Sequence, residues 1–343
     1  MQPGPGPTQQ VAQYHVAGSP PFVPGMSSAR PDRVAVHLIW EAALLVLAAA
    51  FVGVVLASTD GAHLADILRP AGYLGLVAAG LALSMRTATP NLAVGSIATA
   101  TGVIGVHLAI ATGWSLWAGL AVAVAMAVVV GLVTGLVVAG LSVPAWAATL
   151  AVALLVQAAA LGVSNGQTVP IPYRPISSYP TTLWLLVFAA VSVGGGAIWL
   201  APVIRSALSA TRSANDPGRW AGMPAGLGAV AGLTGSSLLA GVGGVALVTY
   251  LRIGDPNSGG INLTLIALAA VLVGGVSVFG RRAGVVGTVL GVVIAQTMLF
   301  LLSIHAAAPY WTDVAIGGLL ALGLCVSRSM ESIAHALSRR RVA

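Results

Sequence analysis

The residues of this chain that could do chemistry are uncharged polar side chains set inside long apolar stretches. Hydroxyl and amide groups can hold a polar solute through hydrogen bonds, but they supply no carboxylate for an ion-coupled carrier. Because an amide that faces lipid without a partner is costly, each of them must face another helix or a cavity. The candidates for a solute pathway are Asn91, Ser96, Gln157, Asn262, Thr264 and Gln296.

The two asparagines are favoured among these candidates, because each stands at the opening of a predicted helix. Asn91 follows Pro90, and Asn262 lies just after the pair Gly259-Gly260. Where a helix breaks inside a membrane, its backbone groups must be satisfied by water, by the protein or by a solute. A pathway role is therefore favoured for both asparagines, while a hydrogen bond between helices stays the alternative for all six candidates.

Other kinds of chemistry find little support in the sequence. No Ser/His/Asp cluster, paired carboxylate or metal-ligand spacing occurs, and His107 and His305 have no ligand partner at helical spacing. Glu41 and Asp313 lie near the ends of predicted spans, not at a midplane where an ion-coupled carrier usually places carboxylates. The chain also lacks lysine, and with it any phosphate-binding loop. We therefore expect no enzyme, no metal and no cofactor, and any ATPase must be a separate polypeptide.

The elements that must position these residues are membrane-spanning helices. Hydrophobic residues make up 57% of the chain, charged residues 7%, and the mean hydropathy is +0.96. A chain of this composition has to satisfy its backbone hydrogen bonds inside lipid, which it can do as helices. The sequence thus predicts an all-α polytopic membrane protein of about ten spans. Their expected limits are 37–57, 67–85, 91–111, 115–140, 145–163, 182–204, 225–250, 262–279, 284–304 and 312–328.

The distribution of arginine predicts the orientation. All fifteen basic residues are arginines, and all but Arg69, Arg174 and Arg252 fall on the side of the predicted N-terminus. By the positive-inside rule that side is cytoplasmic, as is the C-terminus. We expect a disordered tail over 1–36, a membrane domain over 37–328 and a basic tail over 329–343. The net charge of +7 then faces anionic lipid or partner proteins, and no nucleic acid is expected.

Two loops are long enough to do more than connect helices. The outer loop 164–181 holds four prolines, which make it rigid and partly extended. The inner loop 205–224 holds three arginines and the pair Asp216-Pro217, which is typical of an N-cap followed by proline at the first helical position. The sequence predicts a short surface helix over about 217–222. The alternative is that 205–224 is only an arginine-rich topological anchor.

A weak internal symmetry relates the two asparagines. Pro90-Asn91-Leu92 opens one small-residue span and Ile261-Asn262-Leu263 opens another, and the arginine distribution makes the two spans run in opposite directions. Transporters are often built from inverted repeats of this kind. We therefore expect an inverted repeat.

Several stretches also resemble a known family. The stretch that begins at Gly259, GGINLTLIALAAVLVGGVSVFGRRAGVVGTVLG, resembles the C-terminal signature of permease subunits of ribose-type ABC importers, with its A-A-V-x-x-G-G-x-S-x-F-G run and G-x-x-G-T-x-x-G helix. PNLAVGSIATATGV resembles the family's D-L-S-V-G-S segment, with Asn91 in place of the aspartate. The Ala-Ala pair of the family's cytoplasmic loop is absent, and Pro217, Gly218 and Arg219 occupy that region. The resemblance covers about 67–328.

The resemblance implies a type II-like ABC importer permease in a bacterial plasma (inner) membrane. It further implies a cytoplasmic ABC ATPase, an external solute-binding protein and a second permease, as a homodimer or heterodimer. The solute implied is a sugar, polyol or nucleoside. Contact with the ATPase would fall on the inner loop, at Arg212, Asp216, Pro217, Arg219 and Gly222.

Three alternatives to this interpretation stay open. They are a branched-chain amino acid ABC permease, an ion-coupled secondary carrier, and a membrane scaffold or intramembrane enzyme. Neighbouring genes for an ATPase and a binding protein would separate the first from the other two.

Overall fold

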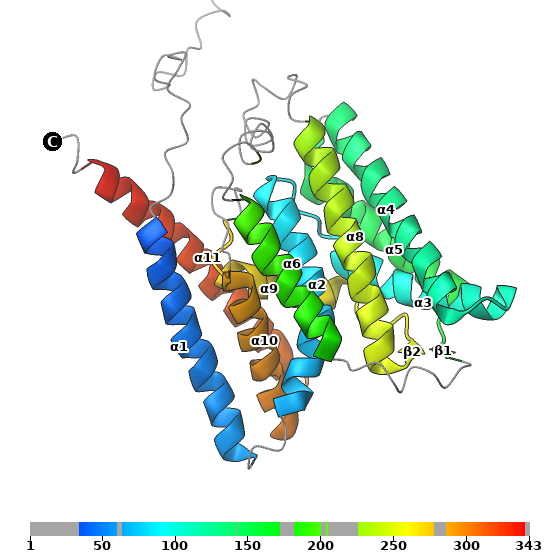
Figure 1. The fold of residues 1–343 in the computed structure, drawn as a ribbon, viewed down its shortest axis with the longest axis horizontal. Helices are drawn as coiled ribbons and strands as arrows, with labels where there is room; N and C mark the ends of the chain where they lie inside the picture. The colour runs from blue at the N-terminus through cyan, green and yellow to red at the C-terminus, as the bar shows by residue number, and fades with distance from the viewer. Residues whose placement is uncertain are drawn as a thin grey trace, which may run out of the picture. The chain divides into compact units, whose positions relative to one another are not determined.

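The computed structural model describes residues 34–59, 64–141, 143–171, 182–199, 204, 226–277 and 286–339. Within these ranges the chain forms α-helices and one two-stranded sheet (Figure 1). The elements are α1 (Val34–Ser58), α2 (Leu64–Arg86), α3 (Val94–Thr112), α4 (Leu116–Leu141), α5 (Ala145–Ser164), β1 (Val169–Pro170), α6 (Thr182–Trp199), α8 (Gly226–Leu251), β2 (Ile253–Gly254), α9 (Gly260–Val273), α10 (Gly287–Ile304) and α11 (Tyr310–Arg339).

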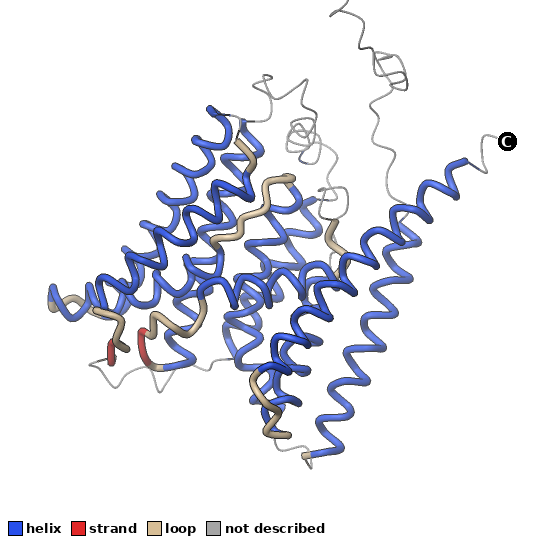
Figure 2. Tube along the Cα trace, turned by 180° about the vertical axis from the view of Figure 1, so that it is seen from behind, coloured by secondary structure: helices blue, strands red, loops and turns tan. Residues whose placement is uncertain are grey.

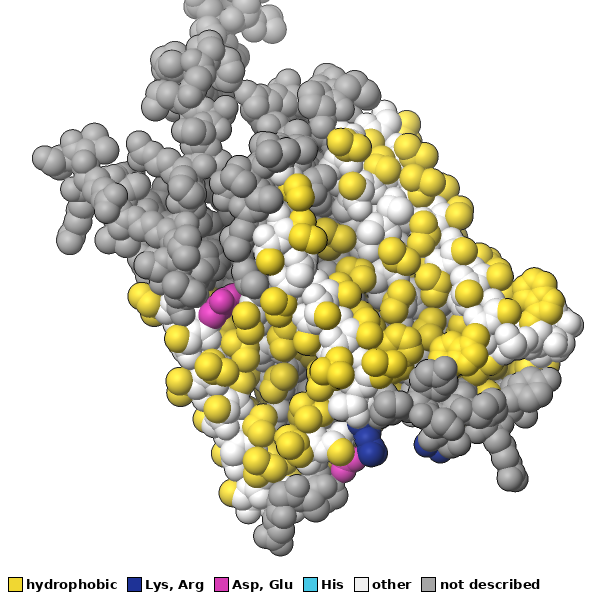
Figure 3. Space-filling view, viewed as in Figure 1, with side chains coloured by type: hydrophobic (Ala, Val, Ile, Leu, Met, Phe, Trp, Pro, Cys, Tyr) yellow, Lys and Arg dark blue, Asp and Glu magenta, His cyan; other side chains and the backbone are white. Residues whose placement is uncertain are grey.

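The prediction of an all-α polytopic membrane protein is confirmed. Eight of the described helices are long and apolar enough to cross a membrane, and two shorter apolar helices lie in α6 and α9. Figure 3 shows the consequence on one face, where hydrophobic side chains cover the middle and the few visible acidic and basic side chains lie toward the edges. Such a surface matches a lipid environment better than water.

The helix limits agree with the predicted spans to within a few residues, with three exceptions. Helix α9 ends at Val273, where residues 262–279 were expected to span. Helix α11 runs to Arg339, well beyond the expected end at 328. Helix α3 begins at Val94, so Asn91 precedes the helix and does not lie inside it. Residues 1–33 of the predicted N-terminal tail, most of the outer loop and the whole inner loop 205–224 lie outside the described residues, and residues 34–36 belong to α1.

Helix α8 is central to the packing and lies against α2, α3 and α4 (Figure 1). Its glycines permit this close approach. A side chain at Gly244 would overlap the carbonyl oxygen of Ala98 on α3, and one at Gly131 on α4 would overlap Leu233 and Ser237 on α8. Small residues let helix backbones approach in a membrane, where burial from water provides no drive for association.

The described helices form two groups with α2 and α6 between them (Figure 1). One group contains α3, α4, α5 and α8, and the other contains α1, α9, α10 and α11. The C-terminal ends of α2 and α6 and the N-terminal ends of α5 and α8 lie at one end of the bundle, which we call the Arg86 end. The small sheet pairs Val169 with Gly254, so it ties the chain after α5 to the chain after α8.

Candidate functional site

The segment 87–93, which connects α2 to α3, is non-helical and yet buried. Thr87, Thr89 and Asn91 are at most 4% exposed. The Asn91 N–H donates to Ser84 Oγ at 3.0 Å, so the chain has turned back alongside α2. The next N–H, that of Leu92, donates to Thr149 Oγ1 of α5 at 3.1 Å. Irregular backbone inside a membrane is tolerated where the protein itself satisfies it, and here side chains of two helices do so.

The Asn91 side chain is fully used by bonds within the protein. Its Nδ2 donates to Ser236 Oγ at 3.1 Å and to Ser237 Oγ at 3.2 Å, both on α8. Its Oδ1 accepts the N–H of Ala93 at 3.1 Å, just before α3. Ser236 lies ten residues into α8, which at 1.5 Å per residue is about 15 Å from the start of that helix. Asn91 therefore fixes the start of α3 deep in the bundle.

Helix α9 also begins inside the bundle. The N–H of its first residue, Gly260, donates to Thr99 Oγ1 of α3 at 2.9 Å. The turn before it is held by Gln157 of α5, whose Nε2 donates to the Pro256 carbonyl at 2.7 Å. The other amide atom, Gln157 Oε1, is buried and makes no hydrogen bond within the described residues. This acceptor lies beside Gly260 and is a candidate partner for a donor outside the chain.

The starts of α3 and α9 hold each other in a reciprocal arrangement that we call the Gly–Thr clasp, made of Gly95, Thr99, Gly260 and Thr264. The Gly95 N–H donates to Thr264 Oγ1 at 3.0 Å, as the Gly260 N–H does to Thr99 Oγ1. Thr99 Oγ1 donates to the Gly95 carbonyl, four residues before it, at 3.0 Å. Thr264 Oγ1 lies 3.4 Å from the corresponding Gly260 carbonyl and 3.3 Å from the Leu92 carbonyl, either of which can accept its hydrogen. Since neither helix has a side-chain cap of its own, the clasp satisfies N–H groups that a helix start leaves open.

Glycine is required at both clasp positions. A side chain at Gly95 would overlap the Gly260 carbonyl oxygen and the Thr264 backbone. Gly260 has φ +58°, a left-handed conformation that side chains disfavour. The two hydrogen bonds join Gly95 to Thr264 and Gly260 to Thr99, so the two helix starts run antiparallel. In these reciprocal bonds Gly95 plays the same part as Gly260, a register that differs from the sequence-based pairing of Asn91 with Asn262. The opposed directions fit the inverted repeat that we predicted.

The structure separates the six predicted pathway residues by environment. Asn91 and Thr264 are buried and bonded within the bundle, and Ser96 is buried in α3. Gln157 and Gln296 are half-buried, while Asn262 is exposed at the start of α9. Sequence reasoning missed the four hydroxyl groups that serve Asn91 and Leu92. These are Ser84, Thr149, Ser236 and Ser237.

Glu41, one of the few carboxylates near a span, has a structural role at the start of α10. Its Oε1 accepts the N–H groups of Val286 at 3.1 Å and Gly287 at 3.2 Å. A carboxylate is favourable there because the N-terminal end of a helix carries partial positive charge. No cluster of three or more His, Cys, Asp or Glu that could hold a metal occurs among the described residues.

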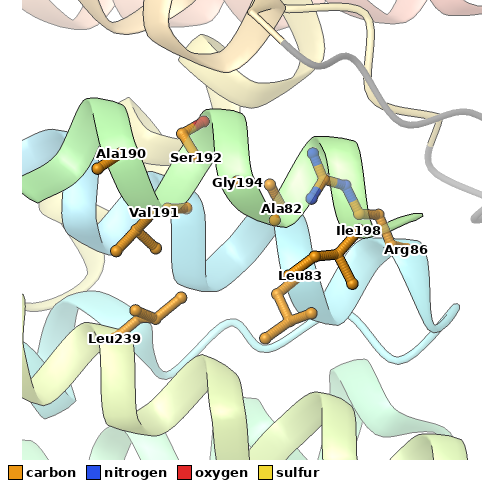
Figure 4. A pocket seen from close by; sticks show the side chains of 11 residues that line it. Ala82, Leu83, Arg86, Ala190, Val191, Ser192, Gly194, Ile198 and Leu239 are labelled. Carbon is orange, nitrogen blue, oxygen red and sulfur yellow. The ribbon is translucent and has the colours of Figure 1, made fainter. Parts of the chain in front are cut away.

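A cavity of about 360 Å³ lies between α2, α6 and α8, toward the Arg86 end. Its walls are mostly apolar, and Figure 4 shows the Arg86 guanidinium between α2 and α6. Arg86 is only 4% exposed, which makes it the one buried charged side chain among the described residues. Ser192 of α6 also lines the cavity. This space can take a small apolar or weakly polar group.

The predicted ATPase contacts, Arg212, Asp216, Pro217, Arg219 and Gly222, lie outside the described residues. Within those residues the arrangement offers hydroxyl and amide groups, helix starts inside a membrane domain and small-residue packing. These features suit movement of a polar solute and offer no covalent chemistry.

Comparison with known proteins agrees with this description. Residues 63–324 match the family described as branched-chain amino acid transport system / permease component. The chain belongs to this permease family. The match runs from the residue before α2 into α11, so the Gly–Thr clasp and Asn91 lie in the part that the permease family shares.

Individual permeases confirm the resemblance to ribose-type ABC importer permeases. The autoinducer 2 import system permease protein LsrC of Enterobacter sp. (strain 638) is 29% identical over 264 residues, which cover 73% of this chain and 74% of LsrC. The L-arabinose transport system permease protein AraH of Escherichia coli (strain K12) is 28% identical, covering 74% of this chain and 78% of AraH. The inner membrane ABC transporter permease protein YjfF of the same strain is 24% identical, covering 77% and 83%. No solved structure matches the chain significantly.

Proposed function

We propose that this chain is the transmembrane permease subunit of an ABC importer for a small polar solute, in particular a sugar, polyol or nucleoside. The observation that carries the proposal is the similarity, over about three-quarters of the chain, to permeases named for L-arabinose transport and for autoinducer 2 import. The permease itself would perform no covalent step. It would alternate between outward-open and inward-open packings that its partners bias.

The chemistry of the interior supports a neutral solute. The buried polar side chains among the described residues are hydroxyl and amide groups, apart from Arg86. Hydroxyl and amide groups match the donors and acceptors of a polyhydroxylated molecule. An amino acid would bring both an ammonium and a carboxylate, and burial of either requires an opposite charge or several strong hydrogen bonds. A sugar-like solute therefore fits this interior better than an amino acid does.

Within this function, Gln157 and Asn262 are the residues that we propose to contact the solute. Gln157 holds the turn before α9 with one amide atom and keeps a buried acceptor at the other. Asn262 is exposed near the same turn. Ser96 and Gln296 are secondary candidates. We assign Asn91 and Thr264 to the structure of the helix starts, because their side chains already form hydrogen bonds within the bundle.

The partners follow from the proposed class. We propose a cytoplasmic ATPase, an external solute-binding protein and a second permease copy or relative, in a bacterial inner membrane with both termini in the cytoplasm. The inner loop 205–224 would seat in the ATPase. Replacing Gly222 with a bulky charged residue, as in Gly222→Arg, should abolish uptake and ATPase association but leave membrane insertion intact. Undiminished uptake by Gly222→Arg would refute this assignment of the loop.

The first test is affinity purification of the chain from its native host in mild detergent, with mass spectrometry of stoichiometric partners. Recovery of an ATPase with a phosphate-binding loop is the expected result. The co-purified or co-encoded binding protein is then screened by thermal shift against sugars, polyols, nucleosides and branched-chain amino acids. Recovery of the chain alone, while a control ABC transporter stays assembled, would favour an ion-coupled carrier.

One alternative within the class has an observation of its own. The family description names branched-chain amino acids. A binding protein that is stabilised by leucine, isoleucine or valine and not by sugars would replace the sugar proposal with this one.

A further inference from the structure

The Gly–Thr clasp lies where the two helix groups of the fold meet directly. Helix α3 belongs to the group with α4, α5 and α8, and α9 belongs to the group with α1, α10 and α11. Figures 1 and 2 show α1 and α11 at one side of the bundle and α4 and α5 at the opposite side. A relative movement of the groups must therefore be accommodated at the contact between α3 and α9.

This contact resists sliding for a steric reason. Gly95 faces the Gly260 backbone so closely that even one methyl group would overlap it. Gly259 faces Thr99 equally closely, and a side chain there would overlap the Thr99 hydroxyl. Packed interiors do not deform continuously, so a translation along either helix would force backbone against backbone.

The contact resists separation for an electrostatic reason. Thr99 is 1% exposed and Thr264 is 0% exposed, so no solvent replaces the bonds if the helices part. Two helix-start N–H groups, those of Gly95 and Gly260, would then be left open in a buried site. Rotation of one helix about the other is the remaining movement that keeps both bonds.

The cavity beside Arg86 is packed less tightly than the clasp. It leaves empty space between α2, α6 and α8, while the clasp has none. Movement is thus easier near the Arg86 end than at the clasp.

We propose that the Gly–Thr clasp is a fixed fulcrum, about which the two helix groups rock while Gly95, Thr99, Gly260 and Thr264 keep their contacts in both transport states. The proposal rests on the proposed function, because it supposes alternating states. Its structural part, that the two bonds act as one unit, does not depend on transport.

The structural part is tested by a double-mutant cycle on the purified permease in mixed micelles. Thr99→Val and Thr264→Val each remove one hydroxyl at nearly constant volume, and the unfolding equilibrium is measured for both single variants and the double variant. Each single variant raises the unfolding equilibrium constant by some factor. If the clasp is one unit, the factor for the double variant is smaller than the product of the two single factors, by about threefold or more. If the factor for the double variant equals the product of the two single factors, the two bonds do not act as one unit and the structural part is refuted.

Two controls accompany the cycle. Thr99→Ser and Thr264→Ser keep the hydroxyl and should stay close to the unchanged protein. Thr297→Val is a matched control, because this buried hydroxyl bonds only to Val293 of its own helix among the contacts described. It should show no coupling with Thr99→Val.

The fulcrum itself is tested by hydrogen exchange of the full complex, with and without trapping of the ATPase by ATP and vanadate. Peptides that cover 94–99 and 259–264 should keep the same protection in both states, while peptides of α6 and α11 change. Faster exchange of the clasp peptides in either state would overturn the fulcrum. If no permease peptide responds to nucleotide, the proposed function fails and the fulcrum fails with it, whereas a response confined to the clasp refutes the fulcrum alone.

Discussion

Helices α3 and α9 begin with the same spacing of glycine and threonine, but the chain reaches the two starts in different ways. The segment before α3, residues 87–93, is largely buried and bonded to Ser84, Thr149 and α8. The segment before α9, residues 252–259, includes exposed Arg252 and Asn257. We call residues 87–93 the sealed approach, because their polar groups bond within the protein and form a helix start. We call residues 252–259 the open approach, because their exposed polar groups could be reached by a solute or a partner.

The difference teaches that residue type alone does not assign a role. Asn91 and Asn262 looked equivalent in the sequence, since each opens a small-residue span. Asn91 is 2% exposed, and both its amide N–H groups and its amide oxygen form hydrogen bonds within the bundle, whereas Asn262 is exposed. Four predictions test whether the two approaches differ as described.

The largest effect is expected at the clasp. Gly95→Leu would force a branched side chain against the Gly260 carbonyl and the Thr264 backbone. Overpacking of a tight interior costs about 1–3 kcal/mol and often more, so we expect loss of most folded protein in size-exclusion chromatography. Gly318→Leu is the matched control, because a side chain at Gly318 of α11 meets nothing within 4 Å. Equal folded yields for the two variants would contradict the close packing.

The next effect concerns the sealed approach. Asn91→Leu leaves the Ala93 N–H without its acceptor, at a cost of about 1–3 kcal/mol, and removes both bonds to α8. Asn91→Asp should cost less, because aspartate keeps an acceptor for Ala93 and the hydroxyls of Ser236 and Ser237 can donate to it. Thermal unfolding of both variants in detergent provides the measurement. Greater damage by aspartate than by leucine would mean that the charge, not the lost bonds, decides stability there.

An intermediate effect is expected at Gln157, which belongs to both structure and pathway in our proposal. Gln157→Leu removes the bond to Pro256 and the buried acceptor, so uptake should fall strongly while the unfolding free energy drops by about 1 kcal/mol. Gln157→Glu keeps an acceptor but loses the donor to Pro256. Uptake by reconstituted vesicles, measured beside the melting temperature, separates the two roles. A parallel loss of both quantities would make Gln157 purely structural.

The smallest effect on stability is expected at Asn262. Because the side chain is exposed, Asn262→Ala should change the unfolding free energy by less than about 0.5 kcal/mol. If the open approach meets the solute, the concentration for half-maximal uptake should rise severalfold at unchanged ATPase association. Unchanged uptake would remove Asn262 from the pathway. Marked destabilisation would show instead that another chain or copy buries this position in the assembly.

The sequence could predict the spans because a membrane imposes a length on apolar helices. Helix α5 was expected over 145–163 and runs from Ala145 to Ser164, since Pro144 and Asn165 bound it clearly. Helix α9 was expected to be longer, because its apolar residues continue past Val273. Composition cannot show that the helix stops there, where Gly274 packs against Gly287 and Gly275 adopts φ +82°.

The site could be predicted only as a set of residue types. Asn91 was expected to open a helix and lies just before α3, but its partners on α8 lie about 145 positions away and nothing local marks them. The clasp had a signal, Gly-x-x-x-Thr at 95–99 and again at 260–264. That signal is weak in a chain with 43 glycines, because many spacings of small residues occur by composition alone. Reciprocal bonding between distant helices is a tertiary property, which makes the structure necessary to see it.

The single cysteine of the chain, Cys325, is exposed on α11. Each permease therefore carries one native thiol, and a spin label attached to it needs no engineered background. In a complex with two copies of this chain, the two labels would report one inter-subunit distance by pulsed electron resonance. A heterodimer of this chain with a cysteine-free relative would carry a single label and give no inter-subunit distance. One spectrum would therefore decide between a homodimer and such a heterodimer. Any change of that distance with nucleotide would then measure the movement of α11 in the working assembly.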